Sequence, residues 1–161
     1  MSFDEPHDEP FPIEGRIAGV DYGTVRIGVS ITDPNRLLSS PLFNYTRGSL
    51  EQDSEFFVRI CHDEGIQGWV VGLPVHTNGE ESQKSREARD FGRWLRSLTQ
   101  LPVCFFDERF TSKEAESILA SVGATRKKKK RHTDSIAAQL LLQAFLEAEP
   151  GAANQRPKPL D

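Results

Sequence analysis

Cysteine is scarce in this sequence, and long apolar runs and a basic N-terminus are absent from it. The two cysteines, Cys61 and Cys104, lie in apolar patterns at a spacing that suggests neither a metal site nor a redox pair, so we expect buried, reduced thiols. No apolar run reaches the roughly 20 residues that a membrane-spanning helix needs. Residues 1–15 hold five acids and no lysine or arginine, the opposite of a secretory signal. These absences predict a cytoplasmic protein that does not enter a membrane.

The formal net charge of -4 hides a strong internal polarity. Setting aside the five N-terminal acids, and Arg156, Lys158 and Asp161 at the other end, leaves 18 basic and 18 acidic residues between positions 16 and 149. Residues 16–149 are therefore predicted to form one neutral domain, large enough to bury a core without disulfides. Residues 1–15 are predicted to be a disordered acidic tail, and residues 150–161 a flexible Pro/Gly-rich tail.

Turn residues and apolar spacing divide the body into strands and helices. Three strand-like runs come first, and their short links predict an antiparallel meander. Two later runs are almost uninterruptedly apolar, which is typical of strands covered on both faces. The expected strands are 16–21, 25–32, 37–46, 68–74 and 101–109, and the expected helices are 51–64, a long one ending near 98, 111–119 and 133–149. This order predicts an α/β fold with a mixed sheet and helices on both faces.

Acidic residues fall at the ends of three of these elements. Asp21 closes the first strand, Asp107 and Glu108 close the last one, and Asp134 opens the final helix. Each has a purely structural alternative: a turn-forming aspartate, an ion pair of Asp107 with Arg109, and a helix cap. Parallel strands share one carboxyl edge, where sites in such folds gather. Asp21 and Glu108 are therefore expected to converge there, with Asp134 alongside.

Three converging carboxylates repel one another, so they would either share protons or hold a divalent metal. All-oxygen ligands suit Mg²⁺ or Mn²⁺, which also accept phosphate oxygens. Two such ions about 4 Å apart would activate a water and stabilise the leaving oxygen in phosphodiester cleavage. The predicted metal ligands and catalytic residues are Asp21, Glu108 and Asp134.

Six consecutive basic residues stand just before Asp134. One interpretation is a solvated loop ahead of a capped helix. The other is a site that holds a polyanionic backbone beside the acids, with affinity but without reading sequence. On the second interpretation the substrate-binding residues are Arg126, Lys127, Lys128, Lys129, Lys130 and Arg131.

Four motifs, in order, carry a resemblance to a known family. They are "GVDYGTVRIGVSITD", "VVGLP…NG", "DERFTSKEAESIL" and "TDSIAAQLLLQAFL", and together they span residues 16–148. The sequence resembles the YqgF family, also called RuvX, a group described as Holliday-junction resolvases and pre-16S rRNA nucleases. The resemblance implies an RNase H-like fold with sheet order 3-2-1-4-5 and strand 2 antiparallel to the rest. It also implies divalent-metal nuclease chemistry on Asp21, Glu108 and Asp134.

One departure from related resolvases concerns the fourth strand, which ends here without an acid. The second carboxylate must then come from the fifth strand; Glu108 is the choice and Asp107 the alternative. Arg26 and Arg109 are further candidates for contact with substrate, each with a structural alternative, a surface strand residue and the pair with Asp107. His132 is a candidate for proton transfer or phosphate contact, against a plain exposed loop histidine.

Several functions remain open on the sequence alone. The first is processing of the 5′ end of pre-16S rRNA; the alternative is resolution of four-way DNA junctions, which usually requires a homodimer. A non-catalytic nucleic-acid-binding module is a third interpretation. The Asp-x-Gly-Thr hairpin at Asp21 also resembles the phosphate-binding turn of actin-like ATPases and sugar kinases. Those proteins use two such lobes, whereas this chain supplies one.

Overall fold

The computed structural model describes residues 11–12, 14–74, 82–110, 117, 120–121 and 133–148. Its strands are β1 (Arg16–Asp21), β2 (Arg26–Thr32), β3 (Ser39–Thr46), β4 (Ile66–Leu73) and β5 (Val103–Asp107). Its helices are α1 (Leu50–Glu64), α2 (Gln83–Thr99) and α4 (Thr133–Glu147), and a short 3-10 turn, η2, spans Glu108–Phe110. Within the described part of the chain, no helix is long and apolar enough to cross a membrane.

The five strands form one mixed sheet in the order β3-β2-β1-β4-β5. β1, β2 and β3 make an antiparallel meander, and β4 and β5 add to β1 in parallel. This confirms the predicted strand order and the antiparallel orientation of strand 2. Since β1, β4 and β5 run the same way, their carboxyl ends meet at one edge of the sheet.

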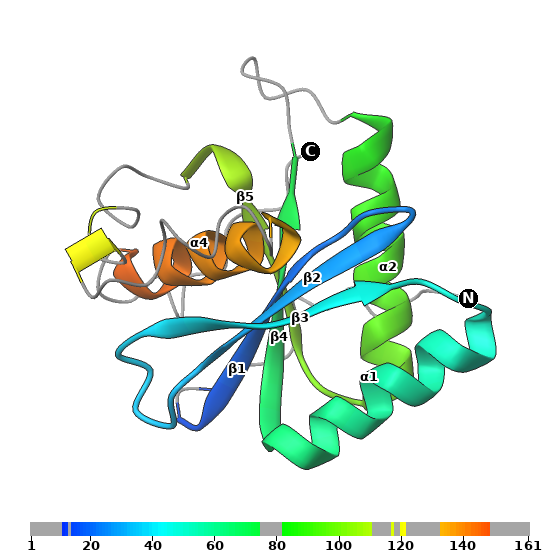
Figure 1. Ribbon diagram of the computed structural model, residues 1–161, viewed down its shortest axis with the longest axis horizontal. Coiled ribbons are helices and arrows are strands. Elements are labelled where there is room, and N and C mark those ends of the chain that lie inside the picture. Colours follow the sequence, from blue (N-terminus) through cyan, green and yellow to red (C-terminus); the bar gives the residue numbers. More distant parts are fainter. Residues whose placement is uncertain are drawn as a thin grey trace.

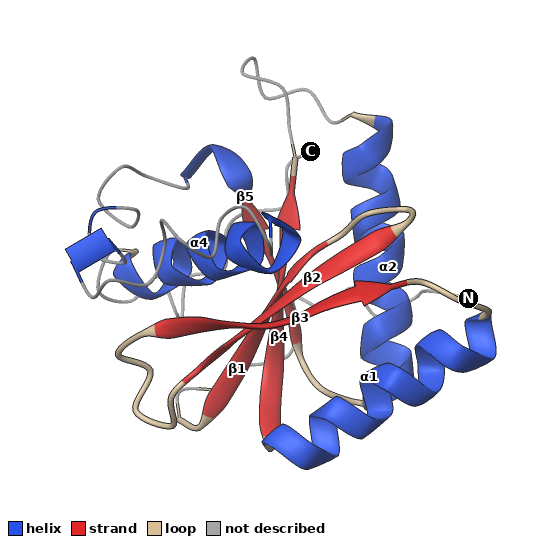
Figure 2. Cartoon of the chain, viewed as in Figure 1, coloured by secondary structure: helices blue, strands red, loops and turns tan. Residues whose placement is uncertain are grey.

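Helices cover both faces of the sheet (Figures 1 and 2). One face, with Val20, Val29 and the fully buried Trp69, packs against α1 and α2. The other, with Ile17 and Val70, packs against α4. The alternation of strand side chains therefore assigns Gly19, Asp21, Gly28 and Gly72 to the α4 face. Placing both apolar faces under helices leaves polar groups at the strand ends free to build a site.

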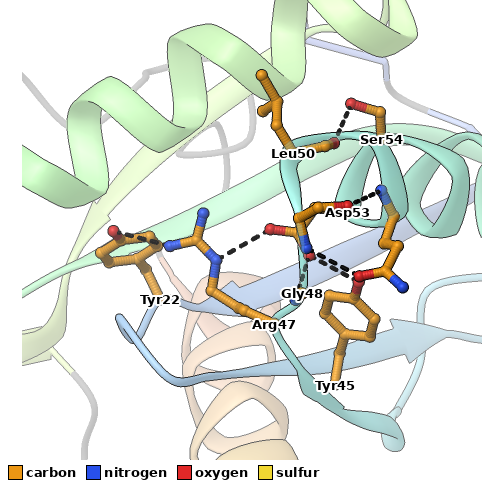
Figure 3. A network of polar contacts seen from close by, with 9 residues as sticks. Tyr22, Tyr45, Arg47, Gly48, Leu50, Asp53 and Ser54 are labelled. Atoms are coloured by element: carbon orange, nitrogen blue, oxygen red, sulfur yellow. Dashed lines mark hydrogen bonds and ion pairs between the residues drawn. The ribbon is translucent and has the colours of Figure 1, made fainter.

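The first helix is fixed at both ends and tied to the end of β3. Ser49 and Gln52 form a capping box, and Gly65 ends the helix in a left-handed conformation with a φ of 63°. Inside the first turn, the buried Asp53 accepts hydrogen bonds from Tyr45 Oη (2.7 Å), Gly48 N (2.9 Å) and Arg47 Nε (3.2 Å) (Figure 3). The cluster locks the β3–α1 connection, and the predicted helix 51–64 is confirmed within one residue.

The described strands and helices begin and end within two residues of their predicted bounds, and the end of the last strand is a difference with a visible cause. The last strand ends at Asp107, because the chain turns into η2 and Arg109 N donates to Asp107 Oδ1 at 2.9 Å. At the other end, Phe11 is buried and its ring lies 5.7 Å from that of Phe145. The packed body thus reaches further toward the N-terminus than residue 16. The helix predicted for 111–119 falls almost wholly outside the described residues.

Candidate active site

A row of matched positions crosses the sheet beneath the start of α4. Asn44 in β3 pairs with Gly28 in β2, and Gly28 pairs with Asp21 in β1. Val20 pairs with Val71, which brings Asp21 level with Gly72 in β4. Two of these positions are glycines, so the backbone of α4 can approach the sheet closely here. An added Cβ on Gly28 would overlap the Asp134 carbonyl.

Glu108 reaches Asp21 across β4 because Gly72 has no side chain. A Cβ on Gly72 would lie only 2.7 Å from Glu108 Oε1, so the carboxylate of Glu108 occupies the space above this glycine. The side chains of Asp21 and Glu108 then hydrogen-bond to each other. This explains how the two acids meet without an acid on the fourth strand: Glu108, which directly follows the fifth strand, takes the space that such a side chain would fill.

The two carboxyl groups favour protonation because they are largely enclosed. Burial raises the pKa of Asp21 to about 6; Lys84 partly offsets this, the charge of Asp134 adds to it, and the hydrogen bond with Glu108 lowers it. Burial also raises the pKa of Glu108 to about 7, and the negative charge of Asp21 adds to that shift. Near neutral pH the pair therefore tends to share a proton.

Asp134 lies near this pair but is engaged elsewhere. Its Oδ2 accepts a hydrogen bond from Arg26 Nε at 3.1 Å, in an ion pair whose arginine is 61% exposed. Among the residues that the structure describes, no three acidic, histidine or cysteine side chains are grouped closely enough to hold a metal. The structure brings Asp21 and Glu108 together and leaves Asp134 bound to Arg26, so the three-acid metal site stays a prediction.

Asp107 and Arg109 form the ion pair that was the structural alternative. Asp107 is 2% exposed, and both of its carboxylate oxygens accept hydrogen bonds from Arg109, the shortest being 2.6 Å from Nη2 to Oδ2. Asp107 is thus committed to Arg109 and does not replace Glu108 beside Asp21. The guanidinium of Arg109 is correspondingly held by Asp107. The remaining predicted residues, Arg126–Arg131 and His132, lie outside the described part of the chain.

Lys84 is a cation of this site that sequence reasoning missed. It is exposed in the first turn of α2, and its charge lowers the pKa of both Asp21 and Glu108. Ser82, which caps α2, donates to Pro74 O at 2.9 Å and accepts from Ser85 N at 3.0 Å, so the helix start is tied to the end of β4. The signal was available: the helix after a parallel strand begins at the strand's carboxyl edge.

The fold defined by this sheet is that of the RuvC-like junction resolvases, within the RNase H-like class. "T. thermophilus RuvC in complex with Holliday junction substrate" superposes with a TM-score of 0.56 at 13% identity, over 84% of this chain and 96% of that one. The yeast mitochondrial Holliday junction resolvase Ydc2 superposes with a TM-score of 0.50 at 11% identity, over 95% and 89%. At these identities the likeness concerns the fold.

Sequence comparison narrows the class to one family. The chain belongs to the RuvX family, described as Holliday junction resolvase, whose profile matches residues 15–148. A protein of Rhodopirellula baltica is 49% identical over 141 residues, which are 88% of this chain and 82% of its own; one of Koribacter versatilis is 37% identical, over 86% and 91%. Both are named "Putative pre-16S rRNA nuclease". The resemblance carried by the four motifs is thereby confirmed.

Proposed function

We propose that this chain is a divalent-metal-dependent endonuclease that hydrolyses phosphodiester bonds at the 5′ end of pre-16S rRNA. The observation that carries the proposal is the hydrogen-bonded Asp21–Glu108 pair, enclosed at the carboxyl edge of the sheet. Two enclosed carboxylates of raised pKa are costly for the folded protein by themselves. A divalent cation would take the place of the shared proton and remove that cost.

The residues present fit Mg²⁺ or Mn²⁺. Asp21 and Glu108 offer adjacent carboxylate oxygens, and Asp134, near enough to raise the pKa of Asp21, would add a third on leaving Arg26. All these donors are oxygen, which hard divalent ions prefer. When bound, one or two such ions would activate the attacking water and stabilise the leaving oxygen.

The chain's own cations would bring the substrate to the acids. Lys84 and Arg26 are exposed at the rim of the site. A phosphate of the substrate would compete with Asp134 for the Arg26 guanidinium, and that exchange would free Asp134 to turn to the pair. Lys127–Lys130, with Arg126 and Arg131, precede α4 in the sequence and would extend the phosphate-binding surface. Such contacts position a nucleic acid without reading its sequence.

The RNA substrate is supported by the names of the relatives in Rhodopirellula and Koribacter. The family description and the fold shared with RuvC favour a second candidate, cleavage of four-way DNA junctions. These candidates differ in assembly, since one monomer suffices to trim an RNA end, whereas a junction needs two sites in a homodimer. Ribosome maturation would place the protein in the cytoplasm.

A direct test compares cleavage of a 5′-extended small-subunit rRNA precursor and of a four-way DNA junction in Mg²⁺ and in Mn²⁺. The variants are Asp21→Asn, which removes a predicted ligand, and Asp63→Asn, which changes an exposed acid of α1. We expect the wild type and Asp63→Asn to cut the RNA, and Asp21→Asn to lose at least about a hundredfold of the rate.

The other outcomes separate the alternatives. Cutting of the junction alone, lost in Asp21→Asn, would replace the RNA substrate by the DNA one. Binding of either substrate without any cleavage that depends on Asp21 would support the non-catalytic module and overturn the enzyme.

A further inference from the structure

The helix that carries Asp134 is capped by a residue from another strand. The first amides of a helix have no partner within it and need an outside acceptor. Ser135 N, the third amide of α4, donates to Asn44 Oδ1 at 2.8 Å, across 91 positions of sequence. An ordinary cap accepts from this same amide but precedes the helix directly. Asn44 makes that bond from β3.

The register of the strands shows where Asn44 lies relative to Asp21. Asn44 and Asp21 flank Gly28 on its two sides, because each is its cross-strand partner. The first turn of α4 rests on Gly28, with no room for a Cβ beneath the Asp134 carbonyl. The start of the helix therefore lies over Gly28, between the positions of Asn44 and Asp21, and Asn44 bonds to it.

The middle and the far end of α4 are tied to β3 independently of Asn44. Gln143 Oε1 accepts from Ser39 N at 2.9 Å, and Gln139 Nε2 donates to Ser39 O at 3.1 Å. Gln143 is fully buried and lies more than two turns from Asp134. Asn44 and Gln143 thus each form a hydrogen bond between α4 and β3. The bond of Asn44 lies beside the site, and that of Gln143 lies near the other end of the helix.

We propose that Asn44 is a positioning residue, which holds the first turn of α4 so that the Asp134 carboxylate can reach the Asp21–Glu108 pair. The expected effect on cleavage rests on the proposed function. The positioning itself rests on the hydrogen bond between Asn44 and Ser135. Without the bond, the first turn of α4 loses an acceptor and frays, while Asp134 keeps its chemistry. A ligand displaced by about 1 Å can cost up to about a hundredfold in rate.

The experiment compares Asn44→Ala, which removes the acceptor, with Asn44→Asp, which keeps it, and Gln143→Ala, which loosens the far end. Three quantities are measured: amide exchange at Ser135, the Mn²⁺ concentration that gives half of the maximal thermal stabilisation, and kcat and KM for the substrate that the wild type cuts. For Asn44→Ala we expect faster exchange at Ser135, a Mn²⁺ midpoint raised several-fold, and a kcat about tenfold lower at similar KM.

The controls make each failure distinct. Asn44→Asp is expected to restore slow exchange and most of the kcat, and Gln143→Ala to lower the melting temperature without moving the Mn²⁺ midpoint. If Asn44→Ala and Gln143→Ala lose stability alike and neither changes the midpoint or kcat, Asn44 has only a structural role. If the wild type cuts nothing, the proposed function fails. The role of Asn44 is then still decided by two measurements, amide exchange at Ser135 and the Mn²⁺ midpoint.

Discussion

At the scale of single residues, Asp21 and Glu108 form a pair of enclosed acids whose pKa values are both raised. Each is an acid that the fold keeps largely away from water, which raises the pKa of both. The charge of Asp21 raises the pKa of Glu108 further, and that of Asp134 raises the pKa of Asp21. Lys84 offsets part of this but lies exposed in α2 and cannot neutralise both. The pair therefore stores unfavourable energy in the metal-free protein at neutral pH, which the binding of a cation can release.

The raised pKa values predict how stability depends on pH. An acid whose pKa is higher in the folded than in the unfolded chain binds more protons when folded, so stability falls as pH rises between the two values. For this pair the window runs from the ordinary values of 3.8 and 4.5 to about 6 and 7. We expect metal-free Glu108→Gln to be more stable than the wild type by about 1–3 kcal/mol at pH 8.

Urea unfolding of metal-free protein at pH 4 and pH 8 measures this difference. The wild type should lose more stability between the two pH values than Glu108→Gln, and Asp63→Asn should behave as the wild type. Adding Mn²⁺ should stabilise the wild type more at pH 8 than at pH 5, because metal ligands must be deprotonated. Equal pH dependence in the wild type and Glu108→Gln would contradict the enclosed pair.

How far the residues could be predicted depends on where their partners lie. Asp21 and Glu108 could be brought together from sequence because both end strands of the predicted parallel edge. Lys84 was missed, although a helix that follows a parallel strand begins at this same edge. Asn44 could not be predicted, because its position depends on the register of β3 against β2. A register is fixed by tertiary packing, and one step of slip would turn Asn44 to the opposite face.

At the scale of elements, the junction of β3 and α1 has its own internal support. Burial raises the pKa of Asp53, but the hydrogen bonds from Tyr45, Gly48 and Arg47 outweigh it, so the pKa is lowered and the group stays charged. Arg47 also bonds Tyr22 Oη at 3.2 Å and lies over its ring, which ties this junction to the end of β1 (Figure 3).

Removing the acid from this cluster should be costly. Asp53→Ala would leave Arg47, the Tyr45 hydroxyl and the Gly48 amide without the acceptor they share, and the loss of one partner of a buried pair typically costs about 3–5 kcal/mol. We expect a loss of about 3 kcal/mol in the free energy of unfolding, measured by urea denaturation at pH 7. Asp63→Ala, on an exposed face of the same helix, should change it little. A loss below about 1 kcal/mol would show that water replaces the missing carboxylate.

The elements themselves were largely predictable, and their ends were less so. Helix 51–64 was predicted from the helical spacing of its apolar residues and from Gly65, which ends it. The last strand was predicted too long because no glycine or proline after Asp107 marks its end, and Glu108 and Arg109 follow directly. What ends the strand is the bonding of Arg109 to Asp107, an interaction that no periodicity reveals.

At the scale of the whole molecule, charge is segregated along the chain. The basic run at 126–131 and the acids of residues 1–15 are far apart in the sequence, and residues 16–149 are neutral only because they include that run. If the run binds phosphates, its removal should weaken substrate binding for any sequence and reduce its dependence on salt.

Replacing Lys127, Lys128, Lys129 and Lys130 together by alanine tests this. For single-stranded RNA the slope of log K against log salt should become shallower by about 0.7 for each phosphate that the variant no longer neutralises. Titration of binding between low and moderate salt measures the slope, with Arg156→Ala combined with Lys158→Ala as the control. An unchanged slope would make the run a solvated loop.

The position of α4 has a consequence for the synthesis of the protein. This helix follows all five strands along the chain, yet it covers Ile17 and Val70 and carries Asp134, the third predicted ligand. A ribosome makes the strands first, and domains generally fold from the N-terminal side as they emerge. Until α4 has left the ribosome, one apolar face of the sheet stays open and Asp134 is absent from the edge that holds Asp21. A nascent chain therefore exposes this apolar face, and lacks one of the three predicted ligands, until its last helix has emerged.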